Sequence, residues 1–119
     1  MHSGVDYKPA RDPQELARLL VSRELQGDAD GLAALYETQA VLDGGDGRLL
    51  HGREAIRAFY ADLVAAGRRF DLGDQQAALV NGDLALTSTR LPNGMVTAEI
   101  ARRQADGTWL WVIDQPSVA

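Results

Sequence analysis

The chain contains no cysteine and only two histidines among its 119 residues. The missing thiols exclude disulfides, thiolate catalysis and cysteine-based metal sites, so we expect no metal and no cofactor. No apolar run approaches the ~20 residues that a membrane span needs. The net charge is -5 and the basic side chains are dispersed, so we expect neither nucleic acid nor a membrane as a partner.

What the chain does have is the composition of an ordinary globular domain, with 45% hydrophobic and 24% charged residues. We expect a flexible N-terminal segment over residues 1–11 and a single domain over residues 12–119. The first residues lack the apolar core of a signal peptide, so a cytoplasmic location is expected.

The periodicity of apolar residues predicts helices first and strands later. Helical spacing covers three segments, residues 12–26, 28–36 and 52–67, with a short hairpin between the last two. Alternating spacing follows over residues 69–80, 84–91, 95–105 and 108–115. This order predicts an α+β fold with three N-terminal helices packed on a curved antiparallel sheet.

The last predicted hairpin places two acids opposite each other. If Asp106-Gly107 is a two-residue turn, Ala105 pairs with Thr108, and Glu99 then faces Asp114. Facing carboxylates, with Cβ atoms roughly 5 Å apart, repel each other. In a closed pocket this repulsion raises one pKa and creates a proton-transfer site, whereas on a solvated sheet it only costs stability.

The other face of this hairpin carries Trp109, Trp111, Ile100 and Ile113. Such a face is too apolar to remain wet, so it packs either in a core or in an interface. The same register puts Arg102 opposite Trp111, where a cation–π contact is expected.

Three segments, GDADGLAALYE, LLHGREAIRAFYADL and ADGTWLWVIDQPS, resemble the nuclear-transport-factor-2-like superfamily over nearly all of residues 13–117. Within it the chain is most similar to the SnoaL-like and ketosteroid-isomerase-like branch. The resemblance implies a cone-shaped α+β barrel around one deep, mostly apolar pocket. It also implies a homodimer through the outer sheet face, which here would use Trp109, Trp111 and Ile113.

The resemblance further implies a catalytic set of Asp43, Glu99 and Asp114. Asp43 matches the general base of ketosteroid isomerases, Glu99 the acid that bonds their oxyanion, and Asp114 an acid of SnoaL-like polyketide cyclases. Each also has a structural interpretation: a turn before Gly44-Gly45, an ion pair with an arginine, and a solvated strand end. The residues expected to contact a ligand are Tyr36, Tyr60, Phe59, Leu20, Leu110, Val112 and Arg103.

This chain departs from two patterns in the superfamily. Leu20 stands where ketosteroid isomerases carry a tyrosine, and Thr97 stands where limonene-type epoxide hydrolases carry an arginine. The sequence therefore predicts a cofactor-independent isomerase or cyclase acting by acid–base chemistry on a hydrophobic carbonyl compound, polyketide-like or steroid-like. The alternative is a non-catalytic module of the same fold that binds a small apolar ligand or dimerises.

Overall fold

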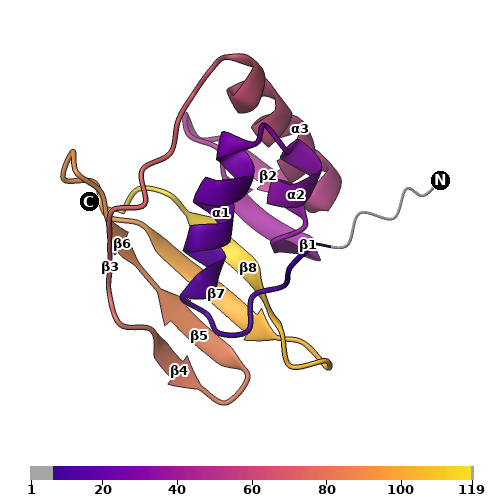
Figure 1. Ribbon diagram of the computed structural model, residues 1–119, viewed down its shortest axis with the longest axis vertical. Coiled ribbons are helices and arrows are strands. Elements are labelled where there is room, and N and C mark those ends of the chain that lie inside the picture. The colour runs from indigo at the N-terminus through magenta and orange to yellow at the C-terminus, as the bar shows by residue number, and fades with distance from the viewer. Residues whose placement is uncertain (1–6, 119) are drawn as a thin grey trace.

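The computed structural model describes residues 7–118. Three helices, α1 (Glu15–Leu25), α2 (Ala29–Ala33) and α3 (Arg53–Ala65), pack on one face of a curved, largely antiparallel sheet (Figure 1). The strands are β1 (Tyr36–Asp43), β2 (Leu49–His51), β3 (Asp74–Gln75), β4 (Leu79–Asn81), β5 (Leu84–Thr87), β6 (Thr89–Arg90), β7 (Ala98–Arg103) and β8 (Trp109–Gln115). The predicted α+β architecture is confirmed.

The main sheet has six strands in the order β2-β1-β8-β7-β5-β4, and β3 pairs with β6 separately. All described strand pairs are antiparallel except β1 with β8, which run in the same direction. The parallel pair joins an early strand of the sequence to the last one. It aligns Tyr36 with Trp111 and Leu42 with Asp114. Residues far apart in sequence thereby meet at the centre of the sheet.

The second helix is shorter than the sequence predicts. It begins as expected, since the Asp28 carboxylate accepts a hydrogen bond from Gly31 N at 2.9 Å and so caps the helix. It ends at Ala33, and Tyr36 is the first residue of β1. Tyr36 is therefore a strand residue, and its side chain is fully buried.

The predicted strand over residues 69–80 is wrong in its first part. The chain enters β3 only at Asp74, and the preceding residues form neither helix nor strand. Gly73 has a φ of 66°, and a Cβ atom there would lie 2.6 Å from the Arg90 carbonyl oxygen. A close backbone approach in the left-handed region requires glycine and interrupts an extended strand.

The final hairpin has a different turn from the predicted one but the same central pairing. Gln104 N donates to Thr108 O, so Ala105, Asp106 and Gly107 form a three-residue loop with Gly107 at φ 85°. A bulge between Ile100 and Ala101 in the β7–β8 register then skips one residue of β8. The two shifts cancel, and Glu99 pairs with Asp114 as predicted.

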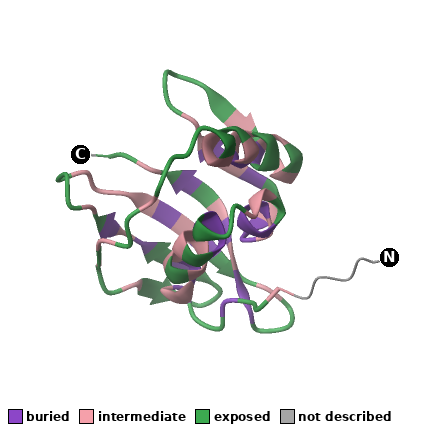
Figure 2. Cartoon of the chain, turned by 45° about the horizontal axis from the view of Figure 1, so that its top comes forward, coloured by how far each residue is buried: buried purple, intermediate pink, exposed green. Residues whose placement is uncertain are grey.

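The bulge reverses the expected placement of the tryptophans. Trp109 and Trp111 are 6% and 2% exposed and belong to the hydrophobic core, on the same side of β8 as Asp114. Ile113 lies on the opposite side and is half exposed. The predicted dimer face of Trp109, Trp111 and Ile113 is therefore wrong for both tryptophans. In Figure 2, buried, intermediate and exposed residues follow one another along the strands. Arg102 pairs with Leu110 instead of Trp111 and forms an ion pair with Glu37.

Residues that precede the predicted domain boundary contact the domain. Ala10 is buried, and its carbonyl accepts a hydrogen bond from Trp109 N at 2.9 Å. Tyr7 donates to Asp28 at 3.0 Å, and the buried Arg23 donates to Lys8 O at 2.7 Å. Residues 7–11 of the predicted N-terminal segment therefore contact the domain, and residues 1–6 lie outside the described part of the chain.

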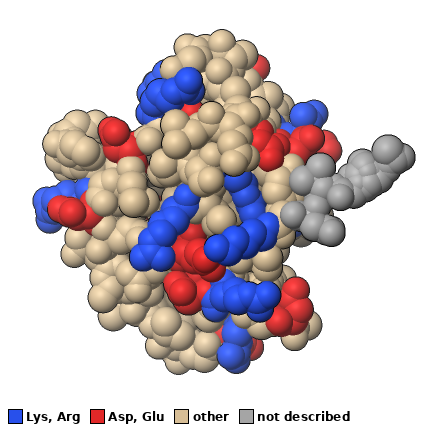
Figure 3. Space-filling view, viewed as in Figure 1, with Lys and Arg blue, Asp and Glu red and all other residues tan. Residues whose placement is uncertain are grey.

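Basic and acidic side chains alternate on the face shown in Figure 3, without a broad patch of either sign. Within residues 7–118, none of the helices combines the length and apolar character needed to cross a membrane.

Candidate functional site

Three side chains form a buried chain of hydrogen bonds where β1, β8 and α3 meet. Tyr36 donates its hydroxyl hydrogen to Asp114 Oδ2 over 2.5 Å, and the hydroxyl oxygens of Tyr36 and Tyr60 are 2.6 Å apart. Tyr36, Tyr60 and Asp114 are 0%, 4% and 7% exposed. The sequence predicted all three as site residues, and the structure brings them together.

Glu99 lies next to this chain. It pairs with Asp114 across the β7–β8 ladder and is itself buried. Its Oε1 accepts a hydrogen bond of 2.6 Å from Thr87 Oγ1 on the neighbouring strand β5. The ion pair with an arginine that the sequence offered as an alternative for Glu99 does not form among the described residues.

The surroundings shift the pKa of every member of the group upward. Burial, followed by the charge of Glu99, raises the pKa of Asp114 to about 7, against a smaller lowering by the Tyr36 hydrogen bond. Burial raises the pKa of Glu99, against a lowering by the Thr87 hydrogen bond. Burial and then the Asp114 charge raise the pKa of Tyr36 and of Tyr60, so both phenols remain protonated.

The number of hydrogens in this chain depends on the protonation state of Asp114. When Asp114 is ionised, the two tyrosine hydrogens satisfy the two oxygen–oxygen contacts, with Tyr60 donating to Tyr36 and Tyr36 to Asp114. When Asp114 is protonated, the same two contacts share three hydrogens. One hydrogen is then free at an end of the chain, and the Tyr60 hydroxyl becomes able to donate to another group.

Asp43 does not join this group. Its carboxylate accepts a hydrogen bond of 2.9 Å from Gly45 N in the exposed β1–β2 turn. On β1 it follows the fully buried Leu42, so its side chain lies on the opposite face of the strand. The structure places Asp43 in the turn role that the sequence left open as an alternative.

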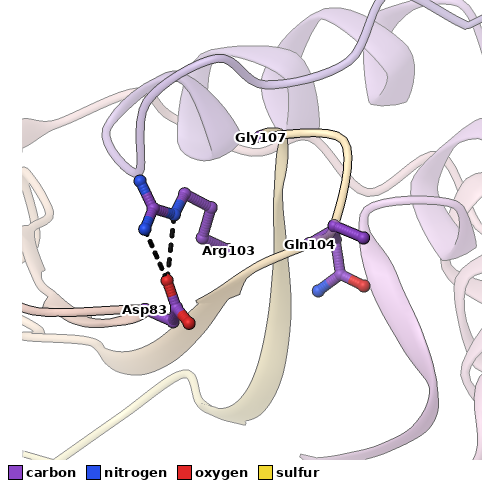
Figure 4. Close-up of a pocket in the computed structure, with 5 residues that line it drawn as sticks. Asp83, Arg103, Gln104 and Gly107 are labelled. Carbon is purple, nitrogen blue, oxygen red and sulfur yellow. Dashed lines mark hydrogen bonds and ion pairs between the residues drawn. The ribbon is translucent and has the colours of Figure 1, made fainter.

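Arg103 also lies away from the acids. It is an exposed residue at the end of β7 and pairs with Asp83 at 2.6 Å (Figure 4). A shallow hollow at the hairpin turn is lined by Asp83, Arg103, Gln104, Ala105 and Gly107. This hollow includes none of the buried acids, so the prediction of Arg103 as a residue of the acidic pocket is wrong.

The apolar ligand contacts predicted from sequence separate into two groups. Phe59 and Leu20 are partly buried against the core, and the Phe59 ring centroid lies 5.4 Å from that of Tyr60. Leu110 alternates with the buried Trp109 and Trp111, so it faces the outer side of the sheet. The prediction that Leu110 shares the Asp114 face is wrong, because the bulge changes the alternation at Val112.

Sequence reasoning missed two residues that surround the site. Trp111 lies with its ring centroid 5.4 Å from that of Tyr36, and its indole Nε1 has no hydrogen-bond partner among the described residues. Phe70 lies with its ring centroid 6.1 Å from that of Tyr60. No glycine or proline marks the bulge in the WLWVID segment, and Phe70 stands in an irregular segment, so no local pattern reveals either position.

The family model of the SnoaL-like domain matches residues 17–116 of this sequence. The chain therefore belongs to the SnoaL-like domain family. None of the curated proteins matches the sequence.

Solved structures of the same fold come from several bacteria. A domain with a cystatin-like fold from Nostoc punctiforme superposes with a TM-score of 0.70 at 19% identity, covering 89% of this chain and 75% of that one. An NTF2-like protein with a cystatin-like fold from Novosphingobium aromaticivorans gives 0.61 at 22% identity, covering 86% and 76%. A ketosteroid isomerase-like protein from Erwinia carotovora atroseptica gives 0.64 at 17% identity, covering 86% and 89%.

Proposed function

We propose that this protein is a small enzyme that moves a proton on an apolar carbonyl compound and thereby isomerises, cyclises or dehydrates it. The observation that carries the proposal is the buried Asp114 carboxyl, which accepts the Tyr36 hydrogen bond and faces Glu99. A general acid–base catalyst works best with a pKa near the working pH, and the pKa of Asp114 is about 7. Membership of the SnoaL-like family and the likeness to a ketosteroid isomerase-like protein support this class.

Ionised Asp114 would act first as a base. It takes a proton from the carbon next to the carbonyl: a C–H bond breaks, an O–H bond forms on Asp114, and the electron pair moves to the carbonyl oxygen. The new O–H of Asp114 then donates to Tyr36, Tyr36 turns its own hydrogen to Tyr60, and Tyr60 is left free to donate to the enolate oxygen. Return of the proton to another carbon completes an isomerisation, and attack of the enolate carbon on a second carbonyl closes a ring.

The substrate would have an apolar frame because apolar side chains surround the Tyr60 end of the chain. Phe59 and Phe70 contact the Tyr60 ring with their edges or faces, at interplanar angles of 69° and 74°. Leu20 and Leu63 are partly buried beside the same core. A ligand held beside these side chains would contact hydrocarbon, with the Tyr60 hydroxyl as the polar contact for its carbonyl oxygen.

Proton–deuterium exchange on 2-decalone, an apolar ketone, tests this function by NMR in heavy water at neutral pD. We expect Asp114→Asn to slow the catalysed exchange by about 100-fold or more, which is the usual contribution of a general base. Asp43→Asn is the matched control, because it makes the same chemical change in the exposed turn. Thermal unfolding of both variants establishes that they are folded.

Equal exchange rates in the wild-type protein and Asp114→Asn would contradict the proposal. Binding of the ketone by the wild-type protein without any catalysed exchange would instead support the alternative of a non-catalytic module for an apolar ligand. In that case Asp114→Asn should retain or improve affinity, because it removes a buried charge.

We also propose that two copies pair through the outer face of the sheet, with a different set of residues from that predicted. Four paired positions cross this face from β4 to β8 and carry only aliphatic side chains: Leu79, Leu86, Ile100 and Ile113. Three of them are 40–68% exposed, and a shallow apolar hollow lies at the β4–β5 end of the row. Arg102 and Glu37 border the row with opposite charges, so a two-fold related copy would present an opposite charge to each.

Sedimentation of Leu86→Asp tests this pairing. We expect the wild-type protein to sediment as a dimer and the variant as a monomer. Leu25→Asp is the control, since Leu25 is an equally apolar exposed residue on α1. A monomeric wild-type protein, or a dimer that survives Leu86→Asp, would contradict the proposal.

A further inference from the structure

An irregular segment connects α3 to β3 alongside α1 (Figure 1). We call residues 68–72 the strap. Its residues form neither helix nor strand, and all are exposed except Phe70, which is half-buried. The strap thus combines an exposed backbone with one side chain that points into the domain.

One buried carboxylate holds the strap in place. Glu24 on α1 is 1% exposed; its Oε1 accepts a hydrogen bond of 2.8 Å from Phe70 N, and its Oε2 pairs with an Arg69 guanidinium nitrogen at 3.0 Å. Within residues 7–118, these are the only hydrogen bonds of residues 69–72. Glu24 therefore has the position of a latch.

Phe70 contacts the ring of Tyr60, the last residue of the buried hydrogen-bond chain. Its ring meets the Tyr60 ring edge-on, with centroids 6.1 Å apart, and it packs against the hydrophobic core. Tyr60 is the member of the chain that gains a free donor when Asp114 is protonated. Movement of Phe70 away from the core would therefore expose the group that is proposed to contact the carbonyl oxygen.

Both ends of the strap lie next to fixed points. Gly67 and Gly73 flank it at φ values of 76° and 66°, where glycine is the least strained residue. Beyond Gly73 the chain is fixed to the start of α1, since Gln75 Nε2 donates to Gln14 O at 2.8 Å. Before Gly67 it is fixed by α3. Arg68 N still donates to Leu63 O of α3 at 3.1 Å, so residues 69–72 are the part of the chain between these fixed points that Glu24 alone holds.

We propose that the strap is the gate of the ligand site, with Phe70 as its movable wall and the Glu24–Arg69 pair as the latch that keeps it closed. The proposal rests on the proposed function of the Tyr60–Tyr36–Asp114 group. It assigns to Glu24, Arg69 and Phe70 a role in the admission of an apolar carbonyl or phenolic ligand. Loop gates of enzymes open and close on the microsecond-to-millisecond timescale.

Stopped-flow fluorescence with 2-naphthol, an apolar phenol, tests the gate in the full-length protein. The test variant is Arg69→Ala, which removes the exposed half of the latch and leaves the site untouched. We expect the association and dissociation rate constants to rise together by about threefold or more, with the dissociation constant unchanged within about twofold, because the latch acts on the free and the bound protein alike. The matched control is Arg68→Ala, since Arg68 is an exposed strap arginine outside the ion pairs of the described residues.

Equal rate constants in the two variants would overturn the proposal. A weaker dissociation constant with an unchanged association rate constant would overturn it too, because Arg69 would then be a ligand contact. Hydrogen exchange at the Phe70 amide in the ligand-free protein is an independent measure of the latch. We expect it to be at least about threefold faster in Arg69→Ala than in Arg68→Ala, and equal rates would overturn the latch.

Failure of the proposed function is distinguishable from failure of the gate. A wild-type protein that does not bind 2-naphthol contradicts the ligand site, whereas exchange at the Phe70 amide decides the latch without any ligand.

Discussion

Glu99 and Asp114 face each other on neighbouring antiparallel strands, and each is only 7% exposed. Two carboxylates in this arrangement cannot both ionise without a large cost, since neither has a cationic partner among the described residues. The charge of one carboxylate therefore opposes ionisation of the other. Asp114 releases its proton near neutral pH because burial and the charge of Glu99 both favour the protonated form.

Glu99→Gln should lower the pKa of Asp114. The amide removes the charge that opposes ionisation of Asp114 and still accepts the Thr87 hydrogen bond. We expect the pKa to fall from about 7 by roughly one unit or more, measured by NMR of the carboxyl carbon. Glu37→Gln is the control, because Glu37 pairs with Arg102 and lies outside the buried group. An unchanged Asp114 pKa in Glu99→Gln would show that burial alone sets it.

The two tyrosines should have unequal effects on Asp114. Tyr36 donates directly to the carboxylate, and this hydrogen bond lowers the pKa of Asp114. Tyr36→Phe should therefore raise that pKa above about 7, whereas Tyr60→Phe leaves the direct bond intact and should shift it less. The pH dependence of 2-decalone exchange should move in the same order. A larger shift in Tyr60→Phe would contradict the direction of the hydrogen-bond chain.

Sequence patterns were sufficient to name the residues of the buried group. They were not sufficient to predict which other residues lie on the same side of the sheet. The predicted two-residue turn placed Glu99 opposite Asp114. The pairing is correct although the turn is wrong, because the bulge in β8 offsets the longer loop. The orientation of Trp111 relative to Asp114 depends on that same bulge, which leaves both tryptophans in the core on the side of Asp114. The face of β8 on which Trp111 lies is set by packing between elements that are distant in sequence, and the local spacing of residues does not encode it.

The role of Asp43 shows the limit of transferring a site by resemblance. Its place at the end of β1 matches the family pattern, but the following glycines turn the chain sharply, and Gly45 N takes its carboxylate as a partner. Tyr60 shows the opposite case. Helical periodicity put it on the inner face of α3, and its hydroxyl reaches Tyr36 because the helix crosses the start of β1.

Asp114→Asn should stabilise the protein at neutral and higher pH but not in acid. The pKa of Asp114 is raised in the folded state, to about 7 from an ordinary value of 3.8. Below about pH 4 both states are protonated, so the carboxyl costs nothing. As the pH rises to about 7 the unfolded state loses its proton first, so the wild-type protein loses stability, by at most about 4 kcal/mol.

The asparagine variant lacks this loss and still accepts the Tyr36 hydrogen bond. Urea unfolding at several pH values between 4 and 8 measures the difference. We expect the free energy of unfolding of the variant minus that of the wild type to grow between pH 4 and 7 and then level off. A difference that does not depend on pH would contradict the raised pKa of Asp114.

Trp111 and Ile113 provide a test of which face of β8 is the core. Trp111→Ala should lower the free energy of unfolding by about 3–5 kcal/mol, because a buried indole leaves a large cavity. Ile113→Ala should cost less than about 1 kcal/mol in the monomer, since half of its surface is already in water. Chemical denaturation at low protein concentration, where no dimer persists, separates packing from association. A larger cost for Ile113→Ala than for Trp111→Ala would contradict the bulge that places Trp111 beside Tyr36. It would favour the strict alternation that the sequence predicts.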